Sequence, residues 1–223
     1  GMLNGSHQYW PTSTKNHLWR NEQKIDQIVT PYLTDWFTLE ARDFIRDGAA
    51  DKEGPWFLFL SYNTPHSPMQ AKDDDIARYA HIKDEKRRIY CAMQHCLDWN
   101  IGTIVEELKA SGQLENTLIA FISDNGGSVE VSHAVNAPLR GGKGTFLEGG
   151  IRVPTIYHWP AVLSPGVYQH PVTALDLMAT FVAAAGGVPP EPGVRQTREG
   201  INPKKGPIYD SVNHSRESDF LLT

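Results

Sequence analysis

Cysteine is scarce in this chain. Cys91 and Cys96 are the only thiols among 223 residues. A metal site built from thiolates needs more ligands at closer spacing, so this pair argues against such a site. We expect both residues to be buried, unpaired thiols on a helix, and their small number leaves the redox compartment open.

Long basic or apolar runs are absent as well. The chain has 21 Lys and Arg against 26 Asp and Glu, a formal net charge of −5, without the basic cluster that nucleic-acid binding needs. No apolar run reaches the roughly 20 residues of a transmembrane helix, and no signal peptide or internal repeat is recognised. We therefore expect no nucleic-acid partner and no membrane span. The length fits one compact domain, or one domain with a small appendage.

Apolar runs alternate with helical patterns along the chain. Continuous apolar runs, typical of strands covered on both faces, occur at 56–62, 117–123 and 151–159. The spacing of apolar residues predicts helices at 34–46, 87–111 and 173–185, the first of them ending at Asp47-Gly48. This alternation predicts an α/β fold with a mostly parallel sheet flanked by helices. We also expect Asp73-Asp74-Asp75 to form the solvated start of a helix.

The last part of the chain differs in composition. Residues 188–207 are rich in proline, glycine and charge and indicate a linker, and 208–210 could begin a small strand. We therefore divide the chain into a main domain at 1–187 and a linker with the start of a C-terminal subdomain at 188–223.

Two oxygen-bearing side chains follow the second predicted strand. Asp124 and Asn125 stand at its carboxyl end, where ligands bind in parallel α/β sheets. A carboxylate and an amide oxygen suit Ca²⁺ or Mg²⁺, whereas Zn²⁺ prefers nitrogen and sulfur. The alternative is an ordinary turn, because Asn-Gly is a common turn signal. Two ligands alone cannot hold Ca²⁺, which takes roughly six to eight oxygens.

A glycine-rich loop at 139–145 presents Lys143. A lysine is a compact positive charge suited to an oxyanion, and glycines allow close approach of the backbone. The nucleotide-binding P-loop pattern fails because Gly144 follows Lys143. Arg140 could bind the same anion or brace the loop, and we favour bracing. The alternative for Lys143 is an ordinary exposed lysine, and Glu148 with Arg152 is expected to form a structural ion pair.

His66 follows the first predicted strand and lies between Pro65 and Pro68. The prolines stiffen the loop and fix the direction of the ring. A histidine placed in this way could donate a hydrogen bond to an anion or protonate a departing alcohol. The alternative is a histidine with a purely structural role.

Taken together, these segments resemble the sulfatase family of the alkaline-phosphatase superfamily. The resemblance runs from about Leu18 to Gly187. It is carried, in order, by Trp19-Arg20-Asn21-Glu22, Tyr32-Leu33-Thr34-Asp35, Pro65-His66, 123–127 and 139–154. The family's Cys/Ser-x-Pro-x-Arg motif and its N-terminal pair of acidic metal ligands are not in this sequence. The resemblance therefore implies an alkaline-phosphatase-like domain that is truncated at its N-terminus.

The resemblance implies a sulfuric ester hydrolase that acts on a sulfated carbohydrate or similar ester. Asp124 and Asn125 would hold Ca²⁺, with Mg²⁺ as the second choice, and a formylglycine nucleophile would lie upstream of this chain. His66 and Lys143 would be the catalytic and substrate-binding residues, with Arg140 as a further substrate contact. The expected compartments are periplasm, lysosome or the exterior of the cell, and the oligomeric state is open.

Two other functions are compatible with the sequence. The first is a phosphate or phosphonate ester hydrolase of the same superfamily. Its members usually carry His after the corresponding Asp, so Asn125 argues against it. The second is a non-catalytic, sulfatase-like binding protein. For the sulfatase interpretation we expect residues 1–223 alone to have no sulfatase activity, since the nucleophile is not among them.

Overall fold

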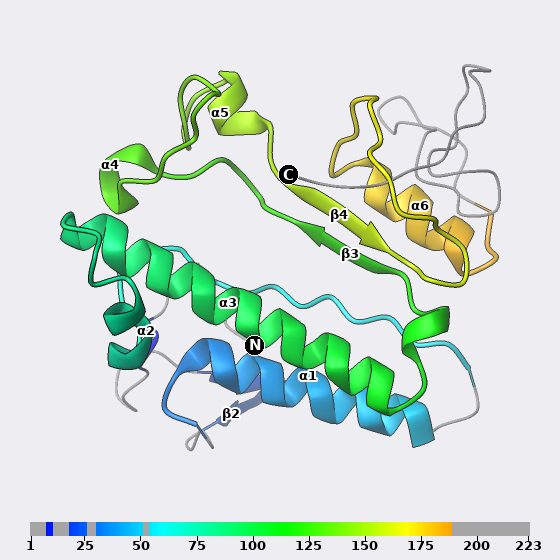
Figure 1. Cartoon of the computed structure of the whole chain (residues 1–223). Helices are drawn as coiled ribbons and strands as arrows, with labels where there is room; N and C mark the ends of the chain where they lie inside the picture. The colour runs from blue at the N-terminus through cyan, green and yellow to red at the C-terminus, as the bar shows by residue number, and fades with distance from the viewer. Residues whose placement is uncertain (1–7, 11–17, 26–29, 51–53, 189–223) are drawn as a thin grey trace. The chain divides into compact units, whose positions relative to one another are not determined.

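The computed structural model describes residues 8–10, 18–25, 30–50 and 54–188 (Figure 1). Contacts divide the chain into two compact units, one made of residues 1–111 and 125–152 and the other of 112–124 and 153–223. The units are described one at a time below. The predicted C-terminal linker and strand lie, from residue 189 on, outside the described residues.

Two long helices form the centre of the first unit. Helix α1 spans Leu33–Ala50 and helix α3 spans Glu85–Ala110, and the two pack side by side (Figure 1). Their buried faces include Trp36 and Ile45 of α1 and Met93 of α3. Both helices arise where the apolar spacing predicted them, because an amphipathic stripe must be covered to be stable.

The ends of these helices have local causes. Asp84 caps α3 by accepting a hydrogen bond from the Arg87 amide at 2.7 Å, and Gly112 follows its end with φ +71°. The predicted end of α1 at Asp47-Gly48 is wrong, since the helix continues to Ala50. A Cβ on Gly48 would lie 2.6 Å from Cδ1 of Trp56. This glycine of α1 therefore makes room for the indole ring of Trp56, which packs against the helix.

Helix α2, Asp73–Arg78, begins at the aspartate run as predicted. The expectation that the run is solvated is wrong for Asp75, which is 8% exposed. Its carboxylate lies 3.7 Å from Lys72 Nζ, 3.8 Å from Arg78 Nε and 3.9 Å from His95 Nε2. Lys72 and Arg78 supply positive charge that offsets part of its loss of water, while its Oδ2 makes no hydrogen bond among the described residues.

The segment predicted as a first buried strand runs extended through the first unit (Figure 1) but forms no ladder among the described residues. Only one of its faces is covered. Leu60 and Tyr62 pack against a cluster of Leu18, Leu33, Trp36 and Phe37. On the other face Phe57 is 65% and Phe59 79% exposed. The continuous apolar run predicted a strand covered on both faces. This is wrong for the described residues, because helix α1 covers one face only.

The first unit also contains a short hairpin and two one-turn helices. Strand β1, Leu18–Arg20, pairs antiparallel with β2, Gln23–Ile25, across a turn in which Asn21 has φ 54°. Helices α4, Val129–Ser132, and α5, Glu148–Ile151, flank the glycine-rich loop.

The second unit contains strands β3, Ile119–Ile122, and β4, Thr155–His158, with the short helix η1, Leu114–Asn116, and helix α6, Asp176–Ala184. The strands pair antiparallel, with Ile119 opposite His158 and Ile122 opposite Thr155.

The predicted parallel sheet is therefore not found among the described residues, where both ladders are antiparallel. A parallel pair needs a crossover that carries the chain back to the starting end of the sheet. Between β3 and β4 the helices are only α4 and α5, each of four residues. The chain thus re-enters the ladder at the end where it left, and the Ser123 amide donates to the Pro154 carbonyl.

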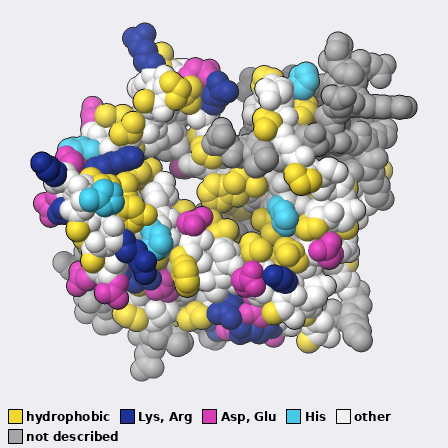
Figure 2. Space-filling view, in the orientation of Figure 1, with side chains coloured by type: hydrophobic (Ala, Val, Ile, Leu, Met, Phe, Trp, Pro, Cys, Tyr) yellow, Lys and Arg dark blue, Asp and Glu magenta, His cyan; other side chains and the backbone are white. Residues whose placement is uncertain are grey.

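Charged side chains of both signs share the surface. Figure 2 shows Lys and Arg lying beside Asp and Glu on the visible face of the described part. Ion pairs of the described residues include Arg46–Asp43, Arg46–Glu107 and Lys109–Glu106. Among the described helices, none combines the length and the apolar character needed to cross a bilayer.

Candidate functional site

The turn after β3 carries the predicted cation ligands. Asp124 is exposed and Asn125 is half-buried. The side-chain nitrogen Nδ2 of Asn125 donates to the Gly126 carbonyl at 2.9 Å. The side-chain oxygen Oδ1 can therefore serve as a cation ligand. The Gly126 amide in turn donates to the Gly150 carbonyl at 3.0 Å. A Cβ on Gly126 would lie 1.8 Å from the Gly149 oxygen, so glycine is required for this contact.

The loop that carries Lys143 is tied to the same turn. The Lys143 amide donates to the Gly127 carbonyl at 3.1 Å, while its side chain is exposed. At the base of the loop the Gly149 amide donates to the Arg140 carbonyl at 2.8 Å. Arg140 therefore braces the loop through its backbone. A contact of its guanidinium with an anion stays a prediction.

Local bonds fix the tip of this loop. Thr145 donates to the Gly142 carbonyl through its hydroxyl at 2.8 Å and its amide at 3.0 Å. Gly141 and Gly144 have φ +86° and +87°, which side chains disfavour. The predicted ion pair between Glu148 and Arg152 is confirmed, with 3.4 Å between Oε2 and Nη1. Both of its side chains are exposed, so it contributes little to stability.

The ring of His66 is exposed and has one nitrogen engaged. Nδ1 lies 2.8 Å from the Ser67 carbonyl oxygen. Since a carbonyl can only accept, Nδ1 carries the proton in the neutral ring and Nε2 is left as the acceptor. A second proton would turn Nε2 into a donor. His66 can thus exchange a proton at one defined atom.

Sequence reasoning missed the residues that anchor the His66 loop. The Tyr9 hydroxyl lies 2.8 Å from the carbonyl oxygens of both Asn63 and His66. The Tyr32 hydroxyl donates to the Gln70 carbonyl at 2.9 Å. Thr34 and Thr64 share a hydroxyl–hydroxyl hydrogen bond of 2.6 Å, both residues being buried. The resemblance included Tyr32 and Thr34, and that was the available signal.

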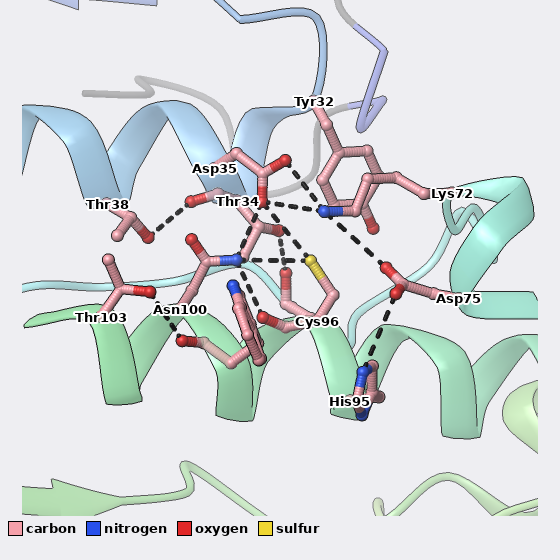
Figure 3. Close-up of polar contacts among 12 residues, drawn as sticks. Tyr32, Thr34, Asp35, Thr38, Lys72, Asp75, His95, Cys96, Asn100 and Thr103 are labelled. Atoms are coloured by element: carbon pink, nitrogen blue, oxygen red, sulfur yellow. Dashed lines mark hydrogen bonds and ion pairs between the residues drawn. The ribbon is translucent and has the colours of Figure 1, made fainter. Parts of the chain in front are cut away.

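A polar network joins α1, α2 and α3 (Figure 3). The Asp35 carboxylate accepts from Lys72 Nζ at 3.0 Å and from Asn100 Nδ2 at 2.8 Å. The Cys96 sulfur lies 3.6 Å from Oδ1 of Asp35. Lys72 also pairs with Asp75, so it bridges two carboxylates. Through Lys72, which follows His66 in the chain, this network connects the segment after His66 to α1 and, by way of Asp35 and Asn100, to α3.

Burial and charge shift two pKa values in the network. Burial, followed by the charge of Asp35, raises the pKa of the Cys96 thiol to about 12. Burial alone would lower the pKa of Lys72, but the hydrogen bond and charge of Asp35 outweigh it and raise that pKa. Both cysteines are unpaired and lie on α3, as predicted. The expected burial is confirmed for Cys96 but is wrong for Cys91, which is only half-buried.

The predicted site residues fall into two groups. A backbone hydrogen bond ties Lys143 to Gly127, two residues after Asn125. His66 is held by a different set of contacts, and its approach to Lys143 stays a prediction. Within the described residues no three His, Cys, Asp or Glu side chains are grouped to hold a metal. The oxygens of Asp124 and Asn125 fit a hard cation by their chemistry, and more ligands must join them.

Comparison with known proteins identifies the family. The model of the sulfatase family matches residues 2–188. An arylsulfatase of Hemicentrotus pulcherrimus is 33% identical over 190 residues, which are 82% of this chain and 32% of that protein. Mouse arylsulfatase J is 36% identical over 157 residues, 70% of this chain and 26% of that protein. The chain belongs to the sulfatase family.

Solved structures agree with this assignment. Ps i-CgsB in complex with k-i-k-neocarrahexaose has a TM-score of 0.73 and 43% identity, covering 82% of this chain and 39% of that one. A sulfatase-family structure from Bacteroides fragilis, at 23% identity and a TM-score of 0.62, supports the fold alone. The alkaline-phosphatase-like α/β fold is thereby supported. The chain spans about a third of the length of the curated relatives it matches.

Proposed function

We propose that the complete protein containing this chain is a sulfuric ester hydrolase that acts on a sulfated carbohydrate. The observation that carries the proposal is the bond from the Lys143 amide to the Gly127 carbonyl. This bond ties the glycine-rich loop that carries Lys143 to the turn that follows Asn125. Family membership and a relative named N-acetylgalactosamine-6-O-sulfatase, 29% identical over 213 residues, favour a sulfated sugar.

Within this site Lys143 would hold the sulfate. Its exposed ammonium can reach an anion above the loop, and Gly144 beside it carries no side chain to block the approach. Arg140 would support it as a second positive charge. Because the transition state places negative charge on the sulfate and the leaving oxygen, a fixed positive charge there lowers the barrier.

His66 would assist the leaving group through Nε2. Its Nδ1–H is held by the Ser67 carbonyl, so the ring cannot turn without losing that bond. A protonated Nε2 can donate to the departing alcohol oxygen, which makes it a better leaving group.

The cation site would be formed by Asp124 and Asn125 together with ligands from outside these residues. Ca²⁺ fits these oxygen donors best and Mg²⁺ second best. When bound, the cation would neutralise charge on the sulfate oxygens, and a formylglycine encoded upstream would supply the nucleophile. By family resemblance, the protein would work in the periplasm, in a lysosome or outside the cell.

The test is hydrolysis by the complete, purified protein. We expect sulfate release from an aryl sulfate and from sulfated oligosaccharides, loss of activity with a chelator, and recovery with Ca²⁺. Preferential hydrolysis of phosphate or phosphonate esters with Zn²⁺ or Mn²⁺ would favour the other superfamily branch instead. Binding of sulfated sugar without any turnover would favour a non-catalytic binding protein.

A second arm uses residues 1–223 alone. They contain no Cys/Ser-x-Pro-x-Arg motif, so this polypeptide should release no sulfate. Turnover by the pure polypeptide would contradict the assignment of the nucleophile to a segment outside it.

A further inference from the structure

Asn136 connects two loops within the first unit. Its Oδ1 accepts from the Gly127 amide at 3.0 Å, and its Nδ2 donates to the Gly127 carbonyl at 3.0 Å. The same Nδ2 donates to the Gly141 carbonyl at 3.1 Å. One side chain thus bridges the turn that follows Asn125 and the loop that carries Lys143.

Glycines make the space that this amide occupies. A Cβ on Gly142 would lie 2.8 Å from Asn136 Nδ2 and 2.6 Å from the Gly127 oxygen. A Cβ on Gly127 would lie 2.5 Å from the Ala134 Cβ and 3.1 Å from Asn136 Oδ1. These glycines therefore serve the packing of Asn136 as well as the approach of a ligand.

The bridge ends close to both proposed functional groups. Gly127 lies two residues after Asn125, and Gly141 lies two residues before Lys143. The Gly127 carbonyl accepts from both Asn136 Nδ2 and the Lys143 amide. A displacement of Asn136 would therefore move the cation-ligand turn and the lysine loop relative to each other.

We propose that Asn136 is a positioning residue that sets the spacing between the Asn125 oxygen and the Lys143 ammonium. The proposal rests on the proposed function for its catalytic consequence. Asn136 acts through Gly127 and Gly141 and needs no contact with substrate. An amide is required because the site uses an acceptor and a donor on one short side chain. A carboxylate supplies only the acceptor.

The test compares variants of the complete protein with the wild type. Asn136→Ala removes all three hydrogen bonds, and Asn136→Asp keeps the acceptor but loses both donations. Asn116→Asp, on the exposed helix η1, is the matched control for the added charge. Hydrogen exchange read by mass spectrometry follows the amides of 125–128 and 139–145. Steady-state kinetics on an aryl sulfate are measured well below each variant's unfolding temperature.

We expect the amides of both segments to exchange at least about tenfold faster in both Asn136 variants. We expect kcat/KM to fall about 10- to 100-fold, because small displacements of positioned groups are costly. Inhibition by inorganic sulfate and half-activation by Ca²⁺ should both shift to higher concentrations. A purely structural role would leave these two values unchanged for the folded enzyme. Asn116→Asp should match the wild type in all measurements.

Three results would overturn the proposal. They are unchanged exchange in both segments, faster exchange with kcat/KM kept within about twofold, and a loss of activity limited to the Asp variant, which would point to charge. If the wild type hydrolyses no sulfate ester but exchange rises as expected, Asn136 does hold the loops and the failure belongs to the proposed function.

Discussion

Removal of the Tyr9 hydroxyl should damage activity more than stability. Tyr9 is fully buried, and its hydroxyl lies 2.8 Å from the carbonyl oxygens of Asn63 and His66. Tyr9→Phe keeps the ring, so no cavity forms, but the two carbonyls lose a shared donor. A net hydrogen bond contributes about 0.5–1.5 kcal/mol, and a buried group left without a partner costs about 1–3 kcal/mol. We expect the free energy of unfolding to fall by about 1–2 kcal/mol.

The activity should fall further because the lost bond holds His66, the residue that we propose as the proton donor. A displacement of the His66 backbone would move Nε2 away from the leaving oxygen, and we expect kcat of the complete protein to fall about tenfold or more. Tyr32→Phe is the matched control. Its hydroxyl donates to Gln70 on the same segment at 2.9 Å, four residues beyond His66. It should lose about 1 kcal/mol of stability and keep its activity within about twofold.

The assay is urea unfolding together with steady-state hydrolysis of an aryl sulfate, at a temperature where all variants are folded. Equal losses of kcat in Tyr9→Phe and Tyr32→Phe would refute the reasoning, since both would then act through general loosening of the segment. Full activity in Tyr9→Phe would refute it as well.

Further predictions concern the turn, the long helix and the buried thiol. Gly126→Ala should prevent the loops from closing, with unfolding at least about 3 kcal/mol easier. Gly102→Ala, in α3 with open space around it, should instead stabilise by about 0.5–1 kcal/mol. Chemical denaturation checks both, and equal effects of the two would contradict the packing argument. Burial raises the pKa of the Cys96 thiol from its ordinary 9.0 to about 12. The contribution of this neutral thiol to the free energy of unfolding is therefore complete below pH 9.0 and is lost as pH rises toward 12. Wild-type stability should therefore fall more steeply above pH 9.0 than that of Cys96→Ala, and parallel pH curves would contradict this.

Local patterns predicted the long helices well. Helices α1 and α3 follow from apolar spacing and caps that operate within a few residues, as the bond from Arg87 to Asp84 shows. The end of α1 could not be predicted in this way, because the Gly48 position depends on Trp56. The direction in which β3 and β4 pair depends on the path of the long connection between them, and periodicity does not report that path.

For the candidate site, too, the sequence indicates local motifs but not contacts between distant residues. The turn of Asp124 and Asn125 and the loop of Lys143 are contiguous motifs, and a glycine-rich composition marks them. Tyr9 bonds to residues 54 and 57 positions away, and such a partnership leaves no trace in local sequence. Asn136 reaches only 9 and 5 positions, yet a single Asn before a proline-containing turn reads as an ordinary loop residue.

The proposed function requires that Lys143 hold sulfate beside a cation bound by Asp124 and Asn125. Its most direct test is the inhibition constant of inorganic sulfate for the complete protein with Ca²⁺ present. Lys143→Ala is compared with Lys109→Ala, an exposed lysine at the end of α3 that pairs with Glu106. A charged hydrogen bond of about 1.5–3 kcal/mol predicts about 10- to 100-fold weaker inhibition for Lys143→Ala. Lys109→Ala should be unchanged. Equal inhibition of both variants and the wild type would contradict the account.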